Sequence, residues 1–144
     1  MNLKGIIAIS GKPGLYKILS HTKSGVIVES LPQGKRTMAS LSSTMSSLDD
    51  ISMYTQTEEL ALREIMRRIA EKQDNGPAPD AKASSDQQLR AFFEQIVPDY
   101  DRERVYPSHI RKLFHWYNLL QSAALVSKEV EEDAPQQQPE TQNE

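Results

Sequence analysis

The sequence predicts an α+β protein with a small five-stranded β-barrel, three α-helices and a disordered acidic C-terminal tail. Short apolar segments separated by turn residues fill residues 3–54, and the hydrophobic period becomes helical after Thr55. A segment rich in Pro, Gly and small residues then separates two helical patterns. The expected units are a barrel module at 1–56, a helix at 57–73, a linker at 74–85, a helical module at 86–126 and the tail at 127–144.

Five strands are expected before residue 55. Each is a short apolar or β-branched segment bounded by turn residues, with turns every ~8–12 residues, as in a sandwich or small barrel. We place the strands at 3–10, 15–20, 26–31, 36–39 and 48–54, with residues 40–47 as a loop or single turn. This size and strand number fit an SH3-like or Sm-like barrel, in which closure removes exposed strand edges.

The segment "ISGKPGLYKI" (9–18) has a Gly-Lys step after an apolar run, as a nucleotide-binding loop would. A Walker A loop, however, needs a closer glycine pair than Gly5 and Gly11, and a hydroxyl residue where Pro13 stands. A strand, rather than a helix, is also expected to follow. Pro13 and Gly14 suit the two central positions of a type II turn, so we expect a turn joining the first two strands.

A first helix is expected at 58–73. Its apolar residues follow the i, i+3, i+4, i+7 spacing of a helix with one buried face: Leu62, Ile65, Met66 and Ile69. Thr55 and Glu58 form a candidate capping box at its start. Because a small barrel alone buries little surface, we expect this helix to pack on the barrel or on the following helices.

Two further helices are expected after the linker. The earlier one begins at a capping box of Ser85 and Gln88 and ends before Pro98, which disfavours helix at the preceding residue. The later one is expected at about 108–125, with Pro107 in its first turn. Its apolar stripe is wide enough to imply burial against at least two elements.

The composition excludes several classes of site. The chain has 144 residues, no cysteine and a net charge of −3, so a disulfide framework, a thiolate zinc site and a Cys nucleophile are excluded. Residues 127–144 are acidic, rich in Gln and Pro and poor in apolar side chains, which predicts disorder. No segment approaches the ~20 apolar residues of a membrane span, and no secretory signal is visible. We therefore expect a cytoplasmic protein with no membrane partner.

No constellation of catalytic or metal-binding residues is recognisable. His109 and His115 are separated by ~240° around a helix, and no paired-histidine zinc motif is present. The alternating charges of "PDYDRERVY" (98–106) are interpreted as a solvated, internally paired loop rather than as an acid–base pair. We therefore expect no enzyme, no cofactor and no metal site.

Two groups of residues are candidates for binding. Basic residues at or near the barrel turns are candidate nucleic-acid contacts: Lys12, Lys17, Lys23, Lys35 and Arg36. Aromatic residues of the C-terminal half are candidate protein-interaction anchors where exposed: Tyr100, Tyr106, Trp116 and Tyr117. The preferred hypothesis is a non-enzymatic binding or adaptor protein with an unidentified protein partner. The alternative is association with RNA or the ribosome through the basic loops of residues 12–36, and the sequence leaves the oligomeric state open.

Several segments carry a family resemblance when taken in order: "ISGKPGLYKIL", "GVIVESL", "LDDISMYT" and "VPDYDRERVYPSHIRKLFHWYNLL". Over about residues 1–125 the chain resembles an uncharacterised family of short bacterial proteins, known only as a domain of unknown function. The resemblance implies a soluble cytoplasmic bacterial protein with an N-terminal β-module and a C-terminal helical module. It implies no activity, cofactor or site residue, because none is assigned to the family.

Overall fold

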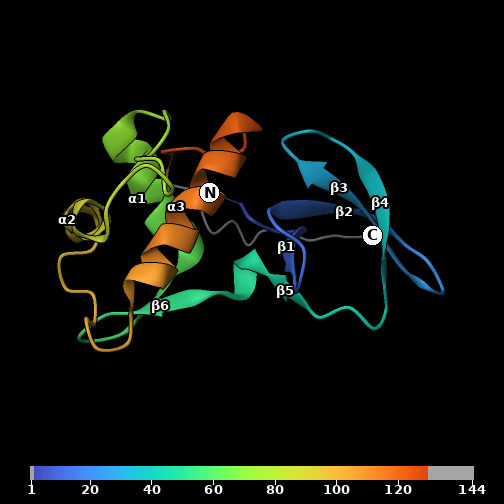
Figure 1. The fold of residues 1–144 in the computed structure, drawn as a ribbon, viewed down its shortest axis with the longest axis horizontal. Helices are drawn as coiled ribbons and strands as arrows, with labels where there is room; N and C mark the ends of the chain where they lie inside the picture. Colours follow the sequence, from blue (N-terminus) through green and yellow to red (C-terminus); the bar gives the residue numbers. More distant parts are fainter. Residues whose placement is uncertain (1, 130–144) are drawn as a thin grey trace, which may run out of the picture.

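The computed structural model describes residues 2–129 and has an α+β architecture, with a sheet at one end and helices at the other (Figure 1). The sheet contains β1 (Ile6–Ile9), β2 (Leu15–His21), β3 (Gly25–Leu31), β4 (Arg36–Ser40) and β5 (Met45–Ser47). A 3-10 helix, η1 (Leu48–Asp50), leads into the hairpin of β6 (Ser52–Tyr54) and β7 (Glu59–Ala61). The helices are α1 (Leu62–Gln73), α2 (Asp86–Ile96) and α3 (Pro107–Ser122). From residue 130 onward, the predicted tail lies outside the described residues.

The five-stranded sheet is antiparallel, with the order β4-β3-β2-β1-β5. Because β4 and β5 are its two edges and do not pair, the predicted closed barrel is not confirmed, and an SH3-like or Sm-like architecture is unsupported. The sheet is nevertheless curled. Four flat strand spacings would separate β4 from β5 by about 19 Å, whereas the chain from Ser40 to Met45 reaches about 17 Å when fully extended.

The predicted turn between the first two strands is confirmed. β1 and β2 form an antiparallel pair joined by residues 10–14, and no helix follows this connection. The hydrogen-bonded turn is centred on Ser10 and Gly11 rather than on Pro13 and Gly14: the Lys12 N–H donates to the Ile9 carbonyl at 3.0 Å, and Gly11 has a φ of +84°. Gly14 also has a positive φ, of +85°.

The fifth strand lies elsewhere than predicted. Residues 48–50 form η1, and β6 pairs with β7 in a separate two-stranded sheet. The fifth strand of the main sheet is instead β5, within the segment expected to be a loop. It pairs with β1 through Ile7↔Ser47, Ala8↔Ser46 and Ile9↔Met45. This strand is therefore defined by main-chain pairing along an edge, and its mostly small polar side chains give no hydrophobic alternation.

The start of α1 also differs from the prediction. The Thr55 hydroxyl donates to the Glu58 carbonyl at 2.6 Å and accepts from the Glu58 N–H at 2.9 Å. These bonds close the β6–β7 turn, so the two residues do not cap a helix, and α1 begins at Leu62. The capping box of Ser85 and Gln88 is confirmed at the start of α2.

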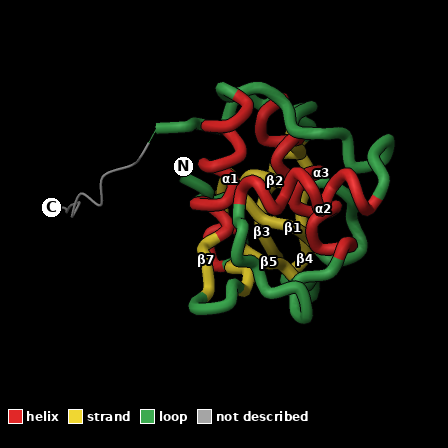
Figure 2. The backbone as a smooth tube through the Cα atoms, turned by 90° about the vertical axis from the view of Figure 1, so that its left-hand side faces the viewer, coloured by secondary structure: helices red, strands yellow, loops and turns green. Residues whose placement is uncertain are grey.

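The sheet and the helices share one main hydrophobic core. Leu3, Ile6, Leu15 and Leu31 from the sheet region belong to the same buried cluster as the apolar faces of all three helices. Seen from the helical end, the helices lie in front of the sheet (Figure 2). A smaller cluster fills the other side of the curled sheet: Ile7, Ile9, Tyr16, Val26, Val28 and Ala39. Successive side chains of β1 point to opposite faces of the sheet, so they contribute to two different cores.

The segment between α1 and α2 is bound to α3. The Asn118 side chain accepts from the Ala78 N–H at 2.7 Å and donates to the Ala78 carbonyl at 3.2 Å. The Tyr117 hydroxyl donates to the Gly76 carbonyl at 2.8 Å. These bonds satisfy main-chain groups that would otherwise be unpaired in a segment without regular structure.

Candidate binding site

A pocket of about 220 Å³ opens between the β6–β7 hairpin and the first half of α3, where β6 passes beside the helix (Figure 1). We call it the hairpin–α3 pocket. It is lined by Ile51, Ser52, Met53, Tyr54, Leu62, Arg104, Val105, His109, Lys112, Leu113 and Trp116. Most of these side chains are apolar. The volume is below the ~300–1,000 Å³ of typical ligand pockets and is suited to one or two side chains.

Main-chain hydrogen bonds fix the walls of the pocket. The Asp101 N–H donates to the Tyr54 carbonyl at 2.9 Å, and Thr55 forms an isolated bridge with Tyr100. The Leu62 N–H donates to the Ile51 carbonyl at 2.9 Å, which joins the start of α1 to the hairpin. The hairpin is thus held to the α2–α3 connection and to the start of α1, and it presents a preformed surface.

The charged side chains that line the pocket, Arg104 and Lys112, are both basic. The Arg104 guanidinium lies 4.8 Å from the centre of the Tyr54 ring, and the Lys112 ammonium lies 5.3 Å from the Trp116 ring. Arg104 also pairs with Asp101 at 3.4 Å. Within residues 2–129, Lys112 has no carboxylate at ion-pair distance, so its charge faces solvent beside the apolar floor.

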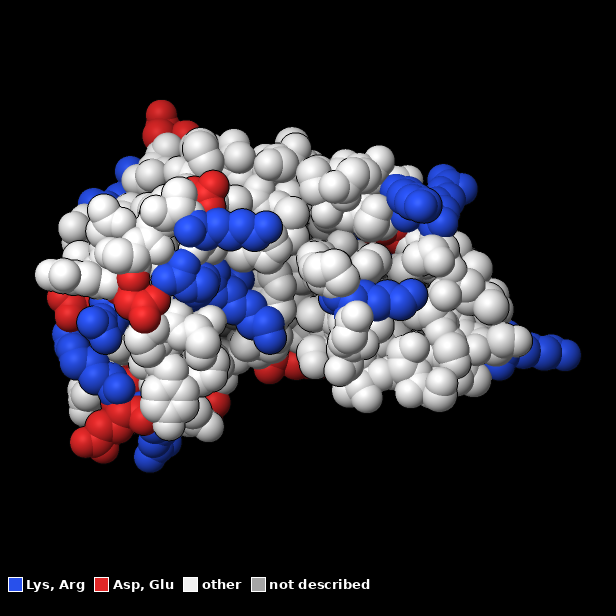
Figure 3. Space-filling view, in the orientation of Figure 1, with Lys and Arg blue, Asp and Glu red and all other residues white. Residues whose placement is uncertain are grey.

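A second pocket, of about 430 Å³, adjoins the first and shares Lys112. It is lined by Ala81, Lys82, Ser108, Arg111, Lys112 and His115. The Arg111 guanidinium already has partners within the chain: it donates to the Ser84 carbonyl at 3.2 Å and pairs with Asp86. Figure 3 shows basic side chains on both parts of this face: over the helical part carboxylates lie beside them, and over the sheet part they stand apart from one another. The second pocket therefore places Lys82 and His115 next to the hairpin–α3 pocket.

The four predicted aromatic anchors divide into two pairs. Tyr106 is 54% exposed, and Trp116 is half-buried in the wall of the hairpin–α3 pocket. Tyr100 and Tyr117 are only 2% and 0% exposed, so they belong to the core and cannot touch a partner directly. Burial raises the pKa of Tyr117 to about 12.

Sequence reasoning missed Tyr54, which is 41% exposed at the pocket rim. Its segment was assigned to the main sheet, where a tyrosine is most simply a core residue. Only the pairing of β6 with β7 places this ring at the surface. The alternation of polar and apolar residues around Met53 predicts a half-exposed strand but does not indicate which strand it pairs with.

The five predicted basic residues are not brought together. Lys12 lies between β1 and β2, and Lys35 and Arg36 lie at the same end of the sheet, because β1 and β3 run in the same direction. Lys23 lies at the opposite end, in the β2–β3 connection. Lys17 faces its cross-strand neighbour Glu29 in β3, and Glu29 also lies 4.0 Å from Arg36.

The acidic residues before α3 have structural partners. Asp101 accepts from the Glu103 N–H at 2.9 Å and pairs with Arg104. The Nδ1 atom of His109 accepts from the Tyr106 N–H at 3.1 Å and so caps α3. Within residues 2–129, no three His, Asp or Glu side chains are grouped to hold a metal ion.

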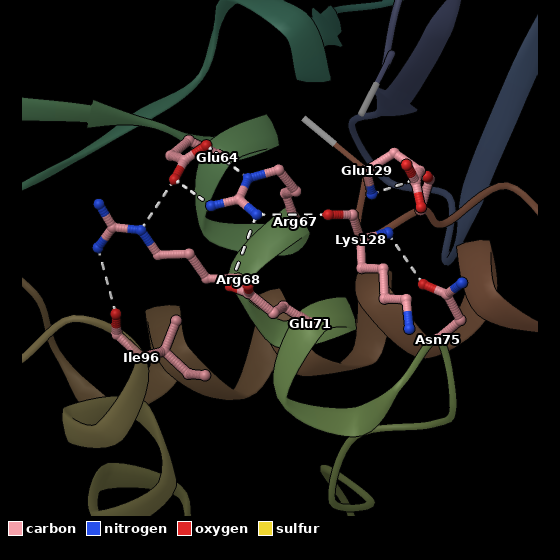
Figure 4. Close-up of polar contacts among 9 residues, drawn as sticks. Glu64, Arg67, Arg68, Glu71, Asn75, Ile96, Lys128 and Glu129 are labelled. Atoms are coloured by element: carbon pink, nitrogen blue, oxygen red, sulfur yellow. Dashed lines mark hydrogen bonds and ion pairs between the residues drawn. The ribbon is translucent and has the colours of Figure 1, made fainter. Parts of the chain in front are cut away.

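A charged cluster on α1 ties three segments together (Figure 4). Glu64 accepts from Arg67 at 2.9 Å and from Arg68 at 3.0 Å. Arg68 also donates to the Ile96 carbonyl at the end of α2, and Arg67 donates to the Lys128 carbonyl after α3. The hydrogen bond from Arg67, followed by that from Arg68, lowers the pKa of Glu64 to about 2. We interpret this cluster as structural, because its charges are mutually paired.

Comparison with known proteins finds two family profiles in the chain, both described as domains of unknown function. One matches residues 3–48 (DUF5606) and the other residues 51–120 (DUF6852). They meet at η1, so the β6–β7 hairpin belongs with the helices. The resemblance predicted one such domain, and the chain carries two. No match was found among the curated proteins.

A solved structure matches almost the whole chain. It is the solution NMR structure of a Bacteroides vulgatus protein, determined by the Northeast Structural Genomics Consortium. The two sequences are 37% identical, the match covers 95% of this chain and 96% of that chain, and the TM-score is 0.74. In residues 2–129, no helix has the length and apolar character that crossing a membrane requires.

Proposed function

The chain belongs to the same family as the Bacteroides vulgatus protein, and we propose that it is a non-enzymatic binding protein that holds a protein partner in the hairpin–α3 pocket. One observation carries this proposal. A preformed apolar pocket opens to the surface beside two aromatic rings, and an ammonium group with solvent on its open side stands at its rim.

The exposed aromatic side chains support a protein as the partner. Tyr54 and Tyr106 are 41% and 54% exposed, although Tyr residues are usually buried to a larger extent. Tyr, Trp and Arg are the residues that most often dominate binding energy at protein interfaces, and they do so around pockets from which water is excluded. Tyr54, Arg104 and Trp116 meet at this one pocket.

Site-specific photo-crosslinking in the native host tests the proposal. A photoreactive phenylalanine analogue replaces Tyr106 in one variant and Met38, on β4, in the control. The two positions are matched in exposure, at 54% and 50%. We expect position 106 to capture a discrete protein and position 38 to capture none.

A second substitution connects the captured protein to the pocket. Lys112→Glu, made in the chain that carries the photoreactive residue at 106, is expected to reduce the crosslink strongly, because it reverses the charge at the rim. Equal capture from positions 106 and 38, or capture that Lys112→Glu leaves unchanged, would contradict the proposal.

The second candidate function is RNA binding through the sheet. The observation in its favour is that Lys12, Lys35 and Arg36 are exposed at one end of the sheet. It ranks second because Tyr16, the aromatic ring nearest to these residues in sequence, is only 9% exposed and offers no stacking platform. RNA binding that falls steeply with salt and is lost on combining Lys17→Glu with Arg36→Glu would favour it. A flat response to salt would count against it.

A further inference from the structure

We propose that the ligand of the hairpin–α3 pocket is a protein segment with an apolar anchor side chain and carboxylates on one flank. This inference rests on the proposed function and specifies the chemistry of the partner. Three features support it: the apolar floor, the opposite charges on the surfaces flanking the pocket, and the cations that cover the aromatic rings.

The floor of the pocket selects an apolar anchor. Met53, Leu113 and Val105 contribute aliphatic surface, and no Asp or Glu lines the pocket. A polar group inserted here would lose its hydration without gaining a hydrogen-bond partner from these side chains. A Leu, Met or Phe side chain would fill the available volume and remove apolar surface from water on both partners.

No acid lines the pocket itself, but the surfaces on its two sides differ in the sign of their charges, which places the carboxylates of the ligand. On the α3 side, Lys112 leads into the second pocket, where Lys82 and His115 are exposed. On the hairpin side, Glu58 and Glu59 are exposed, and Glu59 accepts a hydrogen bond from Ser52 at 2.6 Å. An acidic flank is therefore attracted toward α3 and repelled from the hairpin, so carboxylates are expected on one side of the anchor only.

The geometry favours a peptide over a nucleic acid. A base would need an open aromatic face on which to stack. Arg104 covers one face of Tyr54, and Lys112 covers one face of Trp116, which also packs against the main core. Each ring therefore already has a cation over one face, which leaves less open aromatic surface for a base to stack on. The rest of the recognition surface is aliphatic and cationic.

The fluorescence of Trp116 provides the test, because it is the only tryptophan in the chain and it lines the pocket. The probes are synthetic peptides of about ten residues in which Leu and Phe form the apolar anchor next to a run of glutamates. Two versions are made, one with the glutamates before the anchor and one with them after it. In one control the glutamates become lysines, and in another Leu and Phe become serines. We expect saturable changes in Trp116 emission with at least one acidic peptide and no change with the lysine peptides. The serine peptides are expected to bind at least about tenfold more weakly than the acidic peptide.

Matched variants locate the binding. Lys112→Glu is expected to lower the affinity for the acidic peptide about tenfold or more. Lys23→Glu makes the same charge change on the sheet and is expected to leave the affinity unchanged. Both lysines are exposed, so both variants are expected to unfold at the wild-type temperature. Raising NaCl from about 0.05 to about 0.5 M should weaken binding to the wild-type chain and much less to Lys112→Glu.

Several outcomes would overturn the inference. These are equal binding of the glutamate and lysine peptides, equal effects of the two charge reversals, or saturation by a single-stranded oligonucleotide in preference to the peptides. If Trp116 emission changes with protein concentration in the absence of peptide, the pocket is occupied by a second copy of the chain instead. If position 106 still captures a host protein while no acidic peptide binds, the proposed function stands and the ligand chemistry is wrong. If neither occurs, both are wrong.

Discussion

Glu64 shows how one residue links three segments. Its carboxylate is shared between the guanidinium groups of Arg67 and Arg68, which in turn bind main-chain carbonyls after α3 and at the end of α2. The i, i+4 spacing of Glu64 and Arg68 on a helix predicts their ion pair. The carbonyl partners of the two arginines lie far away in the chain, so no helical spacing could reveal them.

The lowered pKa of Glu64 predicts a dependence of stability on acid. Its pKa is about 2 in the folded chain against an ordinary value of 4.5, so folding is stabilised above pH 4.5. This contribution is lost as the pH falls from 4.5 toward 2. Glu64→Gln should remove that part of the pH dependence and cost about 1 kcal/mol at neutral pH, less than the full pKa shift implies because the side chain is one-third exposed.

Urea unfolding of the full chain at a series of pH values measures this effect. Glu103→Gln is the control, because Glu103 is exposed and has no ion pair within the described residues. It should follow the wild-type curve. Wild-type stability that is flat across the acid range, or a Glu64→Gln curve parallel to the wild type, would show that Glu64 is not the titrating group.

At the scale of elements, main-chain contacts decide what the sequence could not. The capping box at Ser85 was predictable because both partners are local and have distinctive side chains. β5 was not, because its pairing with β1 is formed by the main chain of a mostly polar segment. The β6–β7 hairpin was missed because Thr55 and Glu58 satisfy a capping pattern, although here they close a turn. The candidate site depends on that hairpin, so only part of its wall was predictable.

The segment between α1 and α2 illustrates a second element-scale effect. It was predicted as a linker from its Pro, Gly and small residues. The structure shows how it is held, because Asn118 and Tyr117 of α3 bind its main chain. Such long-range side-chain to main-chain bonds leave no signal in composition.

We therefore expect Asn118→Ala to lower the free energy of unfolding clearly. Removing the amide leaves the Ala78 N–H without its partner at a part-buried position, which costs about 1–3 kcal/mol. Chemical denaturation measures the change, and Asn2→Ala is the control, because Asn2 is exposed and its side chain accepts only a local hydrogen bond from the Lys4 N–H. If Asn118→Ala matches the wild-type unfolding midpoint, the contact does not stabilise the segment.

At the scale of the whole molecule, the two matched domains of unknown function share one hydrophobic core. The sequence left open whether the helices dock on the sheet. Leu3, Ile6 and Leu15 enter the same core as α1 and α3, so each part covers apolar surface of the other. We expect the sheet and the helices to unfold together.

Leu15→Ala tests this coupling. Leu15 is 1% exposed in β2, and its truncation should cost about 2–5 kcal/mol. Amide signals of β2 and β3 and the emission of Trp116 should shift to the same lower denaturant midpoint. A sheet that melts first while the Trp116 transition stays at the wild-type midpoint would show two independent domains.

Chemical-shift mapping tests the central claim, a binding site between the hairpin and α3, most directly. The isotopically labelled full chain is titrated with the acidic, Leu-Phe-containing peptide, and the single indole N–H resonance of Trp116 is followed together with the backbone amides. We expect the indole signal to move and the shifted amides to cluster in residues 51–54, 104–105 and 109–116. Shifts confined to residues 12–36 of the sheet, or an indole signal that stays fixed at saturating peptide, would contradict it.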